Sequence, residues 1–465
     1  MAPNTKVKTL KAEPGGNAQS LHTQSLHTQA PAWPEGAGTR AATQDQAFTF
    51  DVAIVGMGYV GLPTALAINA SGRRVLGLDV SDARLAVIRE QRADLLDSDR
   101  ERLSNALLDP TFMLSSDLSL LAHAAAVVVC VPTPVDEYLV PDLSILRAAC
   151  ASVVDFATTG QLLMLTSTTY VGSTRDLLAL PLAARGLIPG RDVFVAFSPE
   201  RINPGVDSFS HEDVPRVVGG VTPACGEVAE RLLSASTKLV HVVPSADVAE
   251  MTKLVENTFR AVNIALANEF ADICHELNME VMDVIDAAST KPYGFMAFTP
   301  GPGVGGHCIP CDPHYLLWQL RKARLTAPVI EQAMAGIAGR PHQVVEKARR
   351  ILSDRNHGVA GARVMVLGVA YKPDVEDLRE SPALEIIAAL IADGAEVAFS
   401  DPWCQTAPDG HGGTLQSEQS PADWGADLVI LHTRHSQMEL DWLAGAPAVL
   451  DTTYRLPKAD NVTRL

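Results

Sequence analysis

Residues 50–69, FDVAIVGMGYVGLPTALAIN, join a short β-branched apolar run to a helix-like segment through a glycine-rich turn. The turn GMGYVG (56–61) has the spacing G-x-G-x-x-G. In this pattern the first glycine permits a tight turn, the second lets the backbone approach a ligand, and the third lets helix and strand pack closely. A strand, a tight turn and a helix in this order predict an α/β fold with a parallel sheet.

The next apolar run, RRVLGLD (73–79), ends in an acid, Asp79. A carboxylate there can accept hydrogen bonds from ribose hydroxyls and would repel a 2′-phosphate. The N-terminus of the helix after the turn favours a pyrophosphate. Together these features predict that Gly56, Gly58 and Gly61 bind NAD rather than NADP; the alternative is a glycine turn with a structural role only.

The same alternation of strand-like and helix-like segments continues to about residue 200 and returns from residue 362. Between them, residues 247–289 have helical periodicity without proline or glycine, which predicts a long helix with a break near Asn278. The expected fold is therefore two Rossmann-like, doubly wound α/β domains joined by a long central helix.

The expected domain boundaries follow from these changes of pattern. Residues 1–47 are rich in Ala, Pro, Gly, Gln, Thr and Ser, contain the repeat QSLHTQSLHTQ, and are expected to be a disordered tail. We expect the first α/β domain at 48–245, a central helical domain at 246–345 and the second α/β domain at 346–465.

Charge and composition argue against several classes of protein. The formal net charge of −17 leaves no basic surplus for nucleic-acid phosphates, so we expect no nucleic-acid partner. The longest apolar run, AAAVVVCVP (124–132), is too short for a membrane span, and no signal peptide is visible. Seven thinly spread cysteines favour reduced thiols. We therefore expect a soluble cytoplasmic protein without a membrane partner.

The loop GPGVGGHCIPCDPHY (301–315) allows three interpretations. A zinc site needs four ligands, and no second paired motif supplies them, so no metal is expected. A thioredoxin-like dithiol would open a helix just after the first strand of its domain, which this pair does not. In the third interpretation, glycines bring backbone N–H groups close to a ligand that Cys308 attacks. Asp312 is then a base or orienting group, and Cys311 a buried bystander.

Two further polar groups are candidates for ligand binding. Lys253, Asn257 and Arg260 share a face of the central helix, and a buried lysine there needs an anionic partner. The alternative is a solvated polar stripe. Glu200 and Arg201 follow a buried strand, where open parallel sheets bind ligands, although an exposed ion pair is also consistent with the sequence.

Seven motifs, in order from about residue 50 to the C-terminus, resemble those of the nucleotide-sugar 6-dehydrogenases, typified by UDP-glucose dehydrogenase. They are VAIVGMGYVGLP, VCVPTP, TSTTYVGST, SPERINPG, EMTKLVENTFRAVNIALANE, GPGVGGHCIPCDP and GVAYKPDVEDLRESPA. The resemblance implies an NAD-dependent enzyme that oxidises a primary alcohol twice, through an aldehyde captured by cysteine and a thioester cleaved by water. It also implies dimerisation or a higher homo-oligomer through the central domain, UDP-sugar binding by the C-terminal domain, and a role in polysaccharide precursor synthesis.

The resemblance assigns roles to individual residues. The implied catalytic residues are Cys308, Lys253, Asn257, Asp312, Glu200 and Thr133. In these roles Cys308 is the nucleophile, Lys253 with Asn257 stabilises the oxyanion, and the Lys253 ammonium favours the reactive thiolate. Asp312 assists the water or proton transfers, Glu200 thioester hydrolysis, and Thr133 lies beside cofactor and water.

The implied binding residues form two sets. Those for the cofactor are Gly56, Gly58, Tyr59, Val60, Gly61, Asp79, Arg84, Pro132, Thr133 and Thr168. Those for the substrate are Glu200, Arg201, Lys253, Asn257, Arg260, Gly305, Gly306, Lys372 and Arg379. Lys372 and Arg379 would reach the substrate phosphates or the interdomain cleft.

The choice of sugar rests on finer resemblances. SPERINPG resembles the branch that acts on UDP-N-acetylhexosamines, and so do residues 289–310, which most resemble UDP-N-acetylglucosamine 6-dehydrogenases. Ile309-Pro310 stands where N-acetylmannosamine enzymes more often have Ala-Val. UDP-N-acetylmannosamine and UDP-glucose are the alternatives. Thr166, Val171 and Cys311 depart from the family pattern, which more often has glutamate, proline and an aliphatic residue there.

Two other functions are alternatives to a four-electron dehydrogenase. A non-catalytic sensor of NAD or nucleotide sugar would not need the nucleophile Cys308 or its neighbours Lys253, Asn257 and Asp312. A two-electron dehydrogenase that releases the aldehyde would form one NADH per sugar and would not depend on Cys308.

Overall fold

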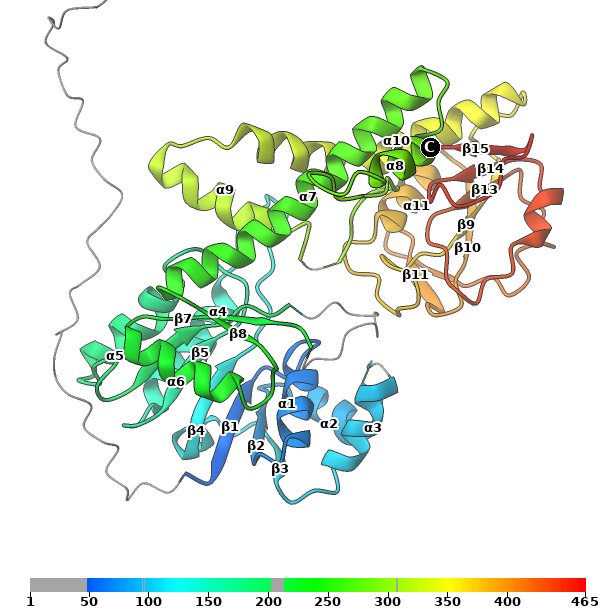
Figure 1. Ribbon diagram of the computed structural model, residues 1–465. Coiled ribbons are helices and arrows are strands. Elements are labelled where there is room, and N and C mark those ends of the chain that lie inside the picture. The colour runs from blue at the N-terminus through cyan, green and yellow to red at the C-terminus, as the bar shows by residue number, and fades with distance from the viewer. Residues whose placement is uncertain (1–47, 94, 96, 202–212, 307) are drawn as a thin grey trace, which may run out of the picture. The chain divides into compact units, whose positions relative to one another are not determined.

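The structure is a computed structural model that describes residues 48–93, 95, 97–201, 213–306 and 308–465. The tail expected at 1–47 lies outside the described residues. Within the described part, the first sheet has eight strands in the order β3-β2-β1-β4-β5-β6-β7-β8 (Figure 1). Its strands are β1 Phe50–Val55, β2 Val75–Leu78, β3 Phe112–Ser115, β4 Ala124–Val129, β5 Leu162–Leu165, β6 Phe194–Phe197, β7 Arg216–Gly220 and β8 Val240–Val243.

Neighbouring strands of this sheet are parallel except for β6 and β7, which pair antiparallel. The central strands are continuous apolar runs, such as LLML in β5, because helices cover both faces. These helices are α1 Gly61–Ala70, α2 Asp82–Arg89, α3 Asp97–Ala106, α4 Ser144–Phe156, α5 Leu180–Ala184 and α6 Pro223–Leu233, with short turns at Leu118–His123 and Arg175–Ala179. Helix α2 ends at Arg89, just before Gln91, which adopts a left-handed φ of 55°.

The predicted long helix is α7, Ala246–Glu276, which begins where the Ser245 hydroxyl accepts a hydrogen bond from the Val248 N–H. It ends before Asn278, whose φ is 55°, and α8 (Val281–Ser289) follows. The predicted break near Asn278 is therefore present.

Two more helices complete the central part of the chain. They are α9, Asp312–Ala323, and α10, Pro328–Asp354. Helix α10 packs against α7, with Met334 and Ile337 against Ala261. The expected boundary between residues 345 and 346 lies inside α10.

The second sheet has five parallel strands within the described residues, in the order β10-β9-β13-β14-β15. Its strands are β9 Arg363–Leu367, β10 Glu396–Ser400, β13 Leu428–Leu431, β14 Val449–Asp451 and β15 Val462–Arg464. Helix α11, Pro382–Ala392, and a short turn at Asp441–Gly445 connect strands of this sheet. A separate hairpin joins β11 Thr406–Pro408 to β12 Thr414–Gln416. The predicted α/β fold with two Rossmann-like sheets and a long central helix is confirmed. Among the described helices, none has the length and apolar character that crossing a membrane requires.

Candidate active site

The glycine turn between β1 and α1 has the geometry of a phosphate-binding turn. Gly56 has φ +93°, and a Cβ on it would lie 2.8 Å from the Cys130 carbonyl oxygen. A Cβ on Gly61 would lie 1.8 Å from the Gly56 carbonyl oxygen, so the turn cannot close with a larger residue there. A Cβ on Gly58 would meet no atom within 4 Å. The backbone at Gly58 is therefore open to a ligand at the helix N-terminus.

Asp79 closes this turn at the end of β2. Its carboxylate accepts a hydrogen bond from the Met57 N–H at 2.9 Å and one from the Ser81 N–H at 2.9 Å. Arg84 donates from Nε to the Met57 carbonyl oxygen at 2.8 Å. Turn and acid thus have the arrangement that a dinucleotide with an unphosphorylated ribose requires, and the residues present fit NAD.

Cys308 and Cys311 lie in very different surroundings. The Cys308 side chain is solvent accessible, whereas Cys311 is only 4% exposed. Burial raises the pKa of the Cys311 thiol to about 12, which leaves it unreactive. Burial, together with the negative charge of Asp312, also raises the pKa of the Cys308 thiol, and Lys253 only partly opposes this. Lys253 thus favours the thiolate, as expected, but burial and Asp312 outweigh its charge and the pKa is raised overall.

Asp312 is the first residue of α9 and lies one turn after the nucleophile candidate. Its N–H donates to the Cys308 carbonyl oxygen at 2.8 Å. Its buried carboxylate accepts from Asn257 Nδ2 and, at 3.4 Å, from Thr168 Oγ1. Burial raises the pKa of Asp312 to about 6, although Lys253, Asn257 and Thr168 each favour the charged form. A carboxyl that titrates near neutrality is suited to proton transfer.

Lys253 and Glu200 connect α7 to the end of β6. Lys253 Nζ donates to the Glu200 carbonyl oxygen at 2.9 Å. The Glu200 carboxylate forms an ion pair with Arg216, at 2.7 Å, and both side chains are largely buried. Arg216 begins β7, and no sequence signal singled it out because its partner, Glu200, follows the preceding strand, β6.

Arg201 points its side chain to other protein groups. It donates to the Pro215 carbonyl oxygen at 2.9 Å and forms an ion pair with Glu256 on α7. The substrate role expected for Arg201 remains a prediction.

The glycines before Cys308 contact protein rather than an open space. A Cβ on Gly305 would lie 2.6 Å from the Glu380 carbonyl oxygen, and one on Gly306 would lie 2.7 Å from the Tyr371 ring. The Gly306 N–H donates to the Arg379 carbonyl oxygen at 2.9 Å. The interpretation that these glycines present N–H groups to a ligand is therefore wrong for Gly306, because its N–H already has a protein acceptor.

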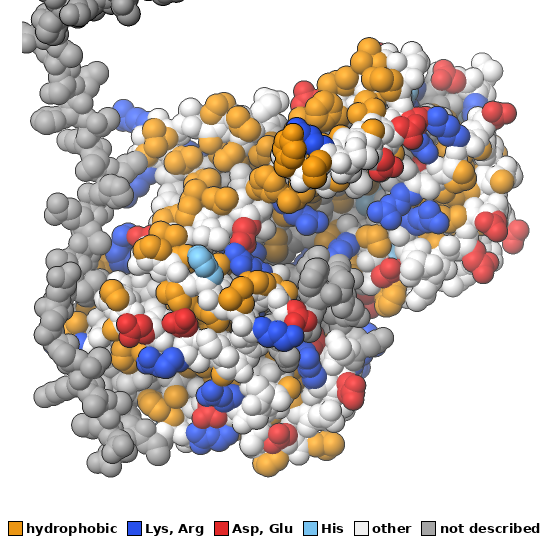
Figure 2. All heavy atoms as spheres, viewed as in Figure 1, with side chains coloured by type: hydrophobic (Ala, Val, Ile, Leu, Met, Phe, Trp, Pro, Cys, Tyr) orange, Lys and Arg blue, Asp and Glu red, His pale blue; other side chains and the backbone are white. Residues whose placement is uncertain are grey.

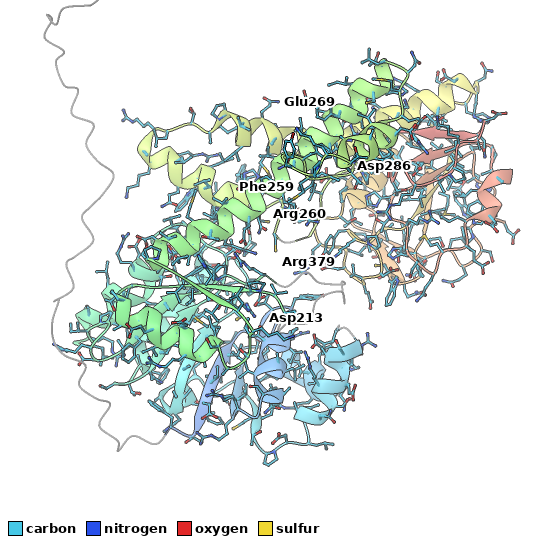
Figure 3. All side chains as sticks on the ribbon, viewed as in Figure 1. Asp213, Phe259, Arg260, Glu269, Asp286 and Arg379 are labelled. Carbon is cyan, nitrogen blue, oxygen red and sulfur yellow. The ribbon has the colours of Figure 1, made fainter. Side chains whose placement is uncertain are left out.

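Three predicted cations approach this loop from different elements. Arg260 lies on α7 (Figure 3). The pKa of Lys372 is lowered mainly by burial of its ammonium and further by the charge of Arg260. Arg379 forms an ion pair with Asp377 at 2.6 Å, and its guanidinium stacks 4.2 Å from the Tyr59 ring centroid. Like charges held near each other are suited to binding a polyanion, such as a diphosphate.

The predicted cofactor residues after β4 and β5 are tied to α9. Tyr315 donates from its hydroxyl to the Thr133 carbonyl oxygen at 3.1 Å, next to Pro132. Gln319 exchanges two hydrogen bonds with the backbone of Val171, at 2.8 and 3.0 Å.

Val60, another predicted cofactor residue, is the N-cap residue of α1.

Glu250 is a buried acid that the sequence analysis did not single out. From the second turn of α7, its carboxylate accepts from Gly172 N–H, from the hydroxyl of Ser173, and from both the N–H and hydroxyl of Thr174, at 2.5 to 2.8 Å. It thereby fixes the segment that carries Thr168 to the helix that carries Lys253. Its position three residues before Lys253, near a helix start, was the only sequence signal available.

A cavity of about 170 Å³ lies beside the cysteine loop. Its lining residues include Gly301, Gly303, Tyr371, His432, Thr433, Arg434, Thr453 and Arg455. His432 is 4% exposed, and its Nε2 has no hydrogen-bond partner among the described residues. His432 Nδ1 lies 2.9 Å from Thr433 Oγ1, whose own proton goes to the Ala370 carbonyl oxygen, so Nδ1 is the protonated nitrogen and Nε2 an acceptor. Arg434 and Arg455 are therefore the groups in this cavity that suit a polar, anionic ligand.

Three family models match the chain. Residues 50–236 match the NAD binding domain, residues 247–336 the central domain and residues 365–457 the UDP binding domain of the UDP-glucose/GDP-mannose dehydrogenase family.

Similar proteins cover most of the chain. An NDP-N-acetyl-D-galactosaminuronic acid dehydrogenase from Ralstonia solanacearum is 32% identical over 88% of this chain and 97% of its own. A UDP-N-acetyl-D-glucosamine 6-dehydrogenase from Pseudomonas aeruginosa is 34% identical over 83% of this chain and 91% of its own. The solved structure of a UDP-N-acetyl-D-mannosamine dehydrogenase from Pyrococcus horikoshii has a TM-score of 0.81 at 30% identity, covering 89% of this chain and 98% of its own.

Proposed function

Because the chain belongs to the UDP-glucose/GDP-mannose dehydrogenase family and is an NAD-dependent nucleotide-sugar dehydrogenase, we propose that it oxidises the C6 hydroxyl of UDP-N-acetyl-D-glucosamine to the uronic acid. The observation that carries this proposal is the meeting of Cys308, Asp312 and Lys253 at one site. An accessible thiol, a carboxyl that titrates near neutrality and an ammonium are the groups that a four-electron oxidation through a thioester requires.

NAD, when bound, supplies the two-electron acceptor for each oxidation at C6, and Gly56, Gly58, Gly61 and Asp79 would hold it. The chain's own residues move the protons. In the first oxidation Asp312 accepts the proton of the C6 hydroxyl as the aldehyde forms. The pKa of Asp312, raised by burial to about 6, leaves its carboxylate ionised and basic enough for this step at neutral pH.

Cys308 then forms the covalent intermediate. Its sulfur bonds to the aldehyde carbon, its thiol proton leaves, and the carbonyl oxygen becomes the oxyanion of a thiohemiacetal. In this proposal Lys253 and Asn257, which adjoin Glu200 and Asp312, stabilise that oxyanion. The second oxidation converts the thiohemiacetal to a thioester, and water then forms the new C–O bond while the C–S bond breaks. The products are the carboxylic acid and the Cys308 thiol.

The C-terminal part of the chain would hold the nucleotide. Lys372 and Arg379 approach the cysteine loop together with Arg260 of α7, and the 170 Å³ cavity adds Arg434 and Arg455. Bidentate and paired cations of this kind suit a diphosphate. The family match of residues 365–457 to a UDP binding domain supports this assignment.

The sugar is proposed from the relatives and from residues 289–310. The three relatives above are named for N-acetylated hexosamines or their uronic acids, at 30 to 34% identity. The acetamido group is thus the common feature, with UDP-N-acetyl-D-mannosamine and UDP-glucose as alternatives to UDP-N-acetyl-D-glucosamine.

Stoichiometry tests this proposal. Purified protein with NAD is expected to form two NADH per UDP-N-acetyl-D-glucosamine consumed, because both oxidations take place before release. NADH absorbance and chromatography of the sugar give the ratio, with UDP-N-acetyl-D-mannosamine and UDP-glucose as parallel substrates. One NADH per sugar would indicate release of the aldehyde, and binding without turnover would indicate a sensor. Faster oxidation of another sugar would correct the substrate and leave the mechanism.

We also propose that the chain forms a homodimer or a higher homo-oligomer through α7. Five large side chains on this helix, Val255, Phe259, Leu266, Phe270 and Ile273, are 44 to 50% exposed. Their spacing of three, four and seven residues forms one stripe, as in a seam between packed helices. Figure 2 shows hydrophobic side chains gathered over the α7 and α8 region. A stripe of this length is typical of a protein interface, and a second copy of α7 would cover it.

Substitution in this stripe should separate the copies. The wild-type protein is expected to sediment as a dimer or larger species, and Phe270→Glu as a monomer, because a charge in the seam would be buried without a partner. Glu269→Gln, at the neighbouring exposed position, is the matched control and should sediment as wild type. A monomeric wild-type protein would contradict the proposal.

A further inference from the structure

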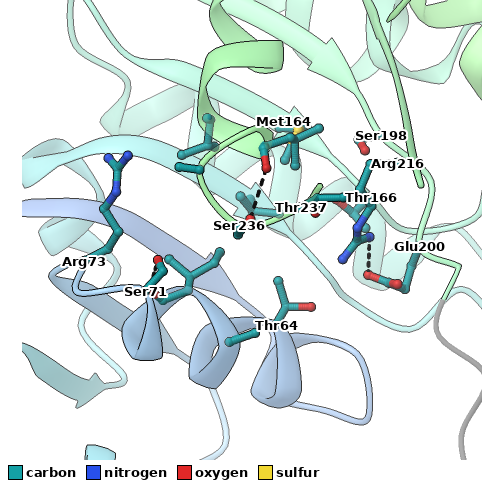
Figure 4. Close-up of a pocket in the computed structure, with 16 residues that line it drawn as sticks. Thr64, Ser71, Arg73, Met164, Thr166, Ser198, Glu200, Arg216, Ser236 and Thr237 are labelled. Atoms are coloured by element: carbon teal, nitrogen blue, oxygen red, sulfur yellow. Dashed lines mark hydrogen bonds and ion pairs between the residues drawn. The ribbon is translucent and has the colours of Figure 1, made fainter. Parts of the chain in front are cut away.

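We propose that a cavity between α1 and α6 delivers the water that cleaves the thioester, an inference that rests on the proposed function. The cavity runs along the face of the first sheet, between these two helices (Figure 4). Its volume is about 40 Å³. A water needs roughly 10–15 Å³ of such space, so the cavity can hold about two or three.

The inner end of the cavity is polar and buried. Glu200 and Arg216 form their ion pair there, with Thr166 beside them (Figure 4). Thr166 is 6% exposed, and its Oγ1 has no nitrogen or oxygen partner among the described residues; the nearby Cys130 thiol is a weak partner only. A buried hydroxyl without a protein partner is costly unless water satisfies it. Next to an ion pair and with space in front of it, the Thr166 hydroxyl therefore points to bound water.

The outer end of the cavity reaches the surface. It is lined by Ser71 at the end of α1 and by Ala235 after α6, which are both exposed. Apolar side chains, among them Ala67 of α1 and Leu232 of α6, also line the cavity. The cavity therefore has exposed residues and the buried ion pair in one lining, as a short path from solvent to that pair would.

Glu200 connects the path to the reacting centre. Its side chain lines the cavity, while its carbonyl oxygen accepts from Lys253 Nζ at 2.9 Å. Its charge also acts on the Cys308 thiol. Water that reaches Glu200 from the cavity thus arrives beside the groups that carry the thioester.

The hydrolysis step balances with water as the only co-reactant. The water oxygen bonds to the acyl carbon, and one water proton passes to the Glu200 carboxylate. The C–S bond breaks, and the sulfur of Cys308 takes up that proton from Glu200. The second water proton remains in the carboxylic acid and is released when the acid ionises. Each turnover consumes one water, which the cavity can replace.

Narrowing the path should slow this step alone. In Ala67→Leu the added side-chain atoms take up space in the cavity that Ala67 lines. With UDP-N-acetyl-D-glucosamine and NAD, we expect the first burst of two NADH per site to be unchanged. Later turnover should fall by about tenfold or more, because a slower final step lowers kcat without changing earlier ones. Intact-protein mass spectrometry after acid quench should show the sugar bound to Cys308.

Ala70→Leu is the matched control, since it makes the same change on the same helix at an exposed position outside the cavity. It should have wild-type burst and turnover. Wild-type turnover in folded Ala67→Leu would overturn the water path.

A second variant keeps the test independent of any folding defect in Ala67→Leu. Thr166→Val preserves the volume but removes the hydroxyl at the inner end. If water occupies the cavity, hydrolysis should slow and the Cys308 adduct should accumulate. If the cavity is dry, the substitution should raise the melting temperature and leave hydrolysis unchanged, which would overturn the inference. A wild-type protein that forms one NADH per sugar without a Cys308 adduct would overturn the proposed function as well. Two NADH with wild-type hydrolysis in both variants would overturn the water path alone.

Discussion

Cys308→Ala is expected to lose net oxidation to the acid by a factor of at least about 10⁴, because removal of a catalytic nucleophile costs on this order or more. Cys311→Val should keep most of the activity. Cys311 is 4% exposed, burial raises its pKa to about 12, and valine fills a similar volume in the same apolar surroundings. NADH formation at saturating substrate, with a melting curve for each variant, measures both effects.

The two variants also separate the remaining interpretations of the cysteine pair. Equal loss in both would indicate that the two thiols act together as a dithiol. Cys308→Ala that still forms one NADH per sugar would indicate a first oxidation without covalent capture, since only the second oxidation needs the sulfur. Full activity in Cys308→Ala would contradict the thioester mechanism.

Local patterns predicted those features of the site that depend on local geometry. The glycine spacing at 56–61 and the acid at Asp79 gave the cofactor turn, because both requirements act within one strand–turn–helix unit. Helical spacing placed Lys253 and Asn257 on one face, and the structure joins that face to Glu200 and Asp312. The long helix and its end near Asn278 followed from periodicity in the same way.

Features that depend on the fold as a whole were missed or wrong. Arg216 pairs with Glu200 from an antiparallel strand that the expected parallel alternation did not include. Gly306 was expected to face a ligand, yet its N–H donates to Arg379 of the second α/β part of the chain. Lys253 does favour the thiolate of Cys308, as expected, but the net direction of the Cys308 pKa could not be predicted from the sequence. Burial and Asp312 outweigh that charge, and only the packed structure supplies the balance.

The raised pKa of Cys308 has a mechanistic consequence. In the absence of bound ligands the thiol keeps its proton near neutral pH, so attack on the aldehyde must be coupled to removal of that proton. Asp312 follows one turn later, on the helix that begins next to Cys308, and carries a pKa of about 6. In the proposed mechanism a carboxylate with that pKa takes the proton of the alcohol, releases it to solvent, and can then take the proton of the thiol.

Asp312→Asn is therefore the second substitution with a large expected effect. Asparagine keeps the shape of the side chain but cannot accept a proton, and loss of a general base lowers kcat by about 10²–10⁴-fold. Substrate binding should change much less, because the Asp312 carboxylate is buried against Asn257 and Thr168 rather than exposed to the nucleotide. Steady-state kinetics, with a melting curve as the control for folding, separate the loss of kcat from any change in KM.

The pH profile distinguishes a base from a merely structural acid. The proposed mechanism requires ionised Asp312, so wild-type kcat should fall as the pH is lowered through about 6. This limb should be absent in Asp312→Asn. Thr168→Val removes a donor that favours the charged carboxylate, so it should move the limb to higher pH and leave activity at high pH closer to wild type. An unchanged acid limb in Asp312→Asn would show that a different group titrates and that Asp312 does not move the proton.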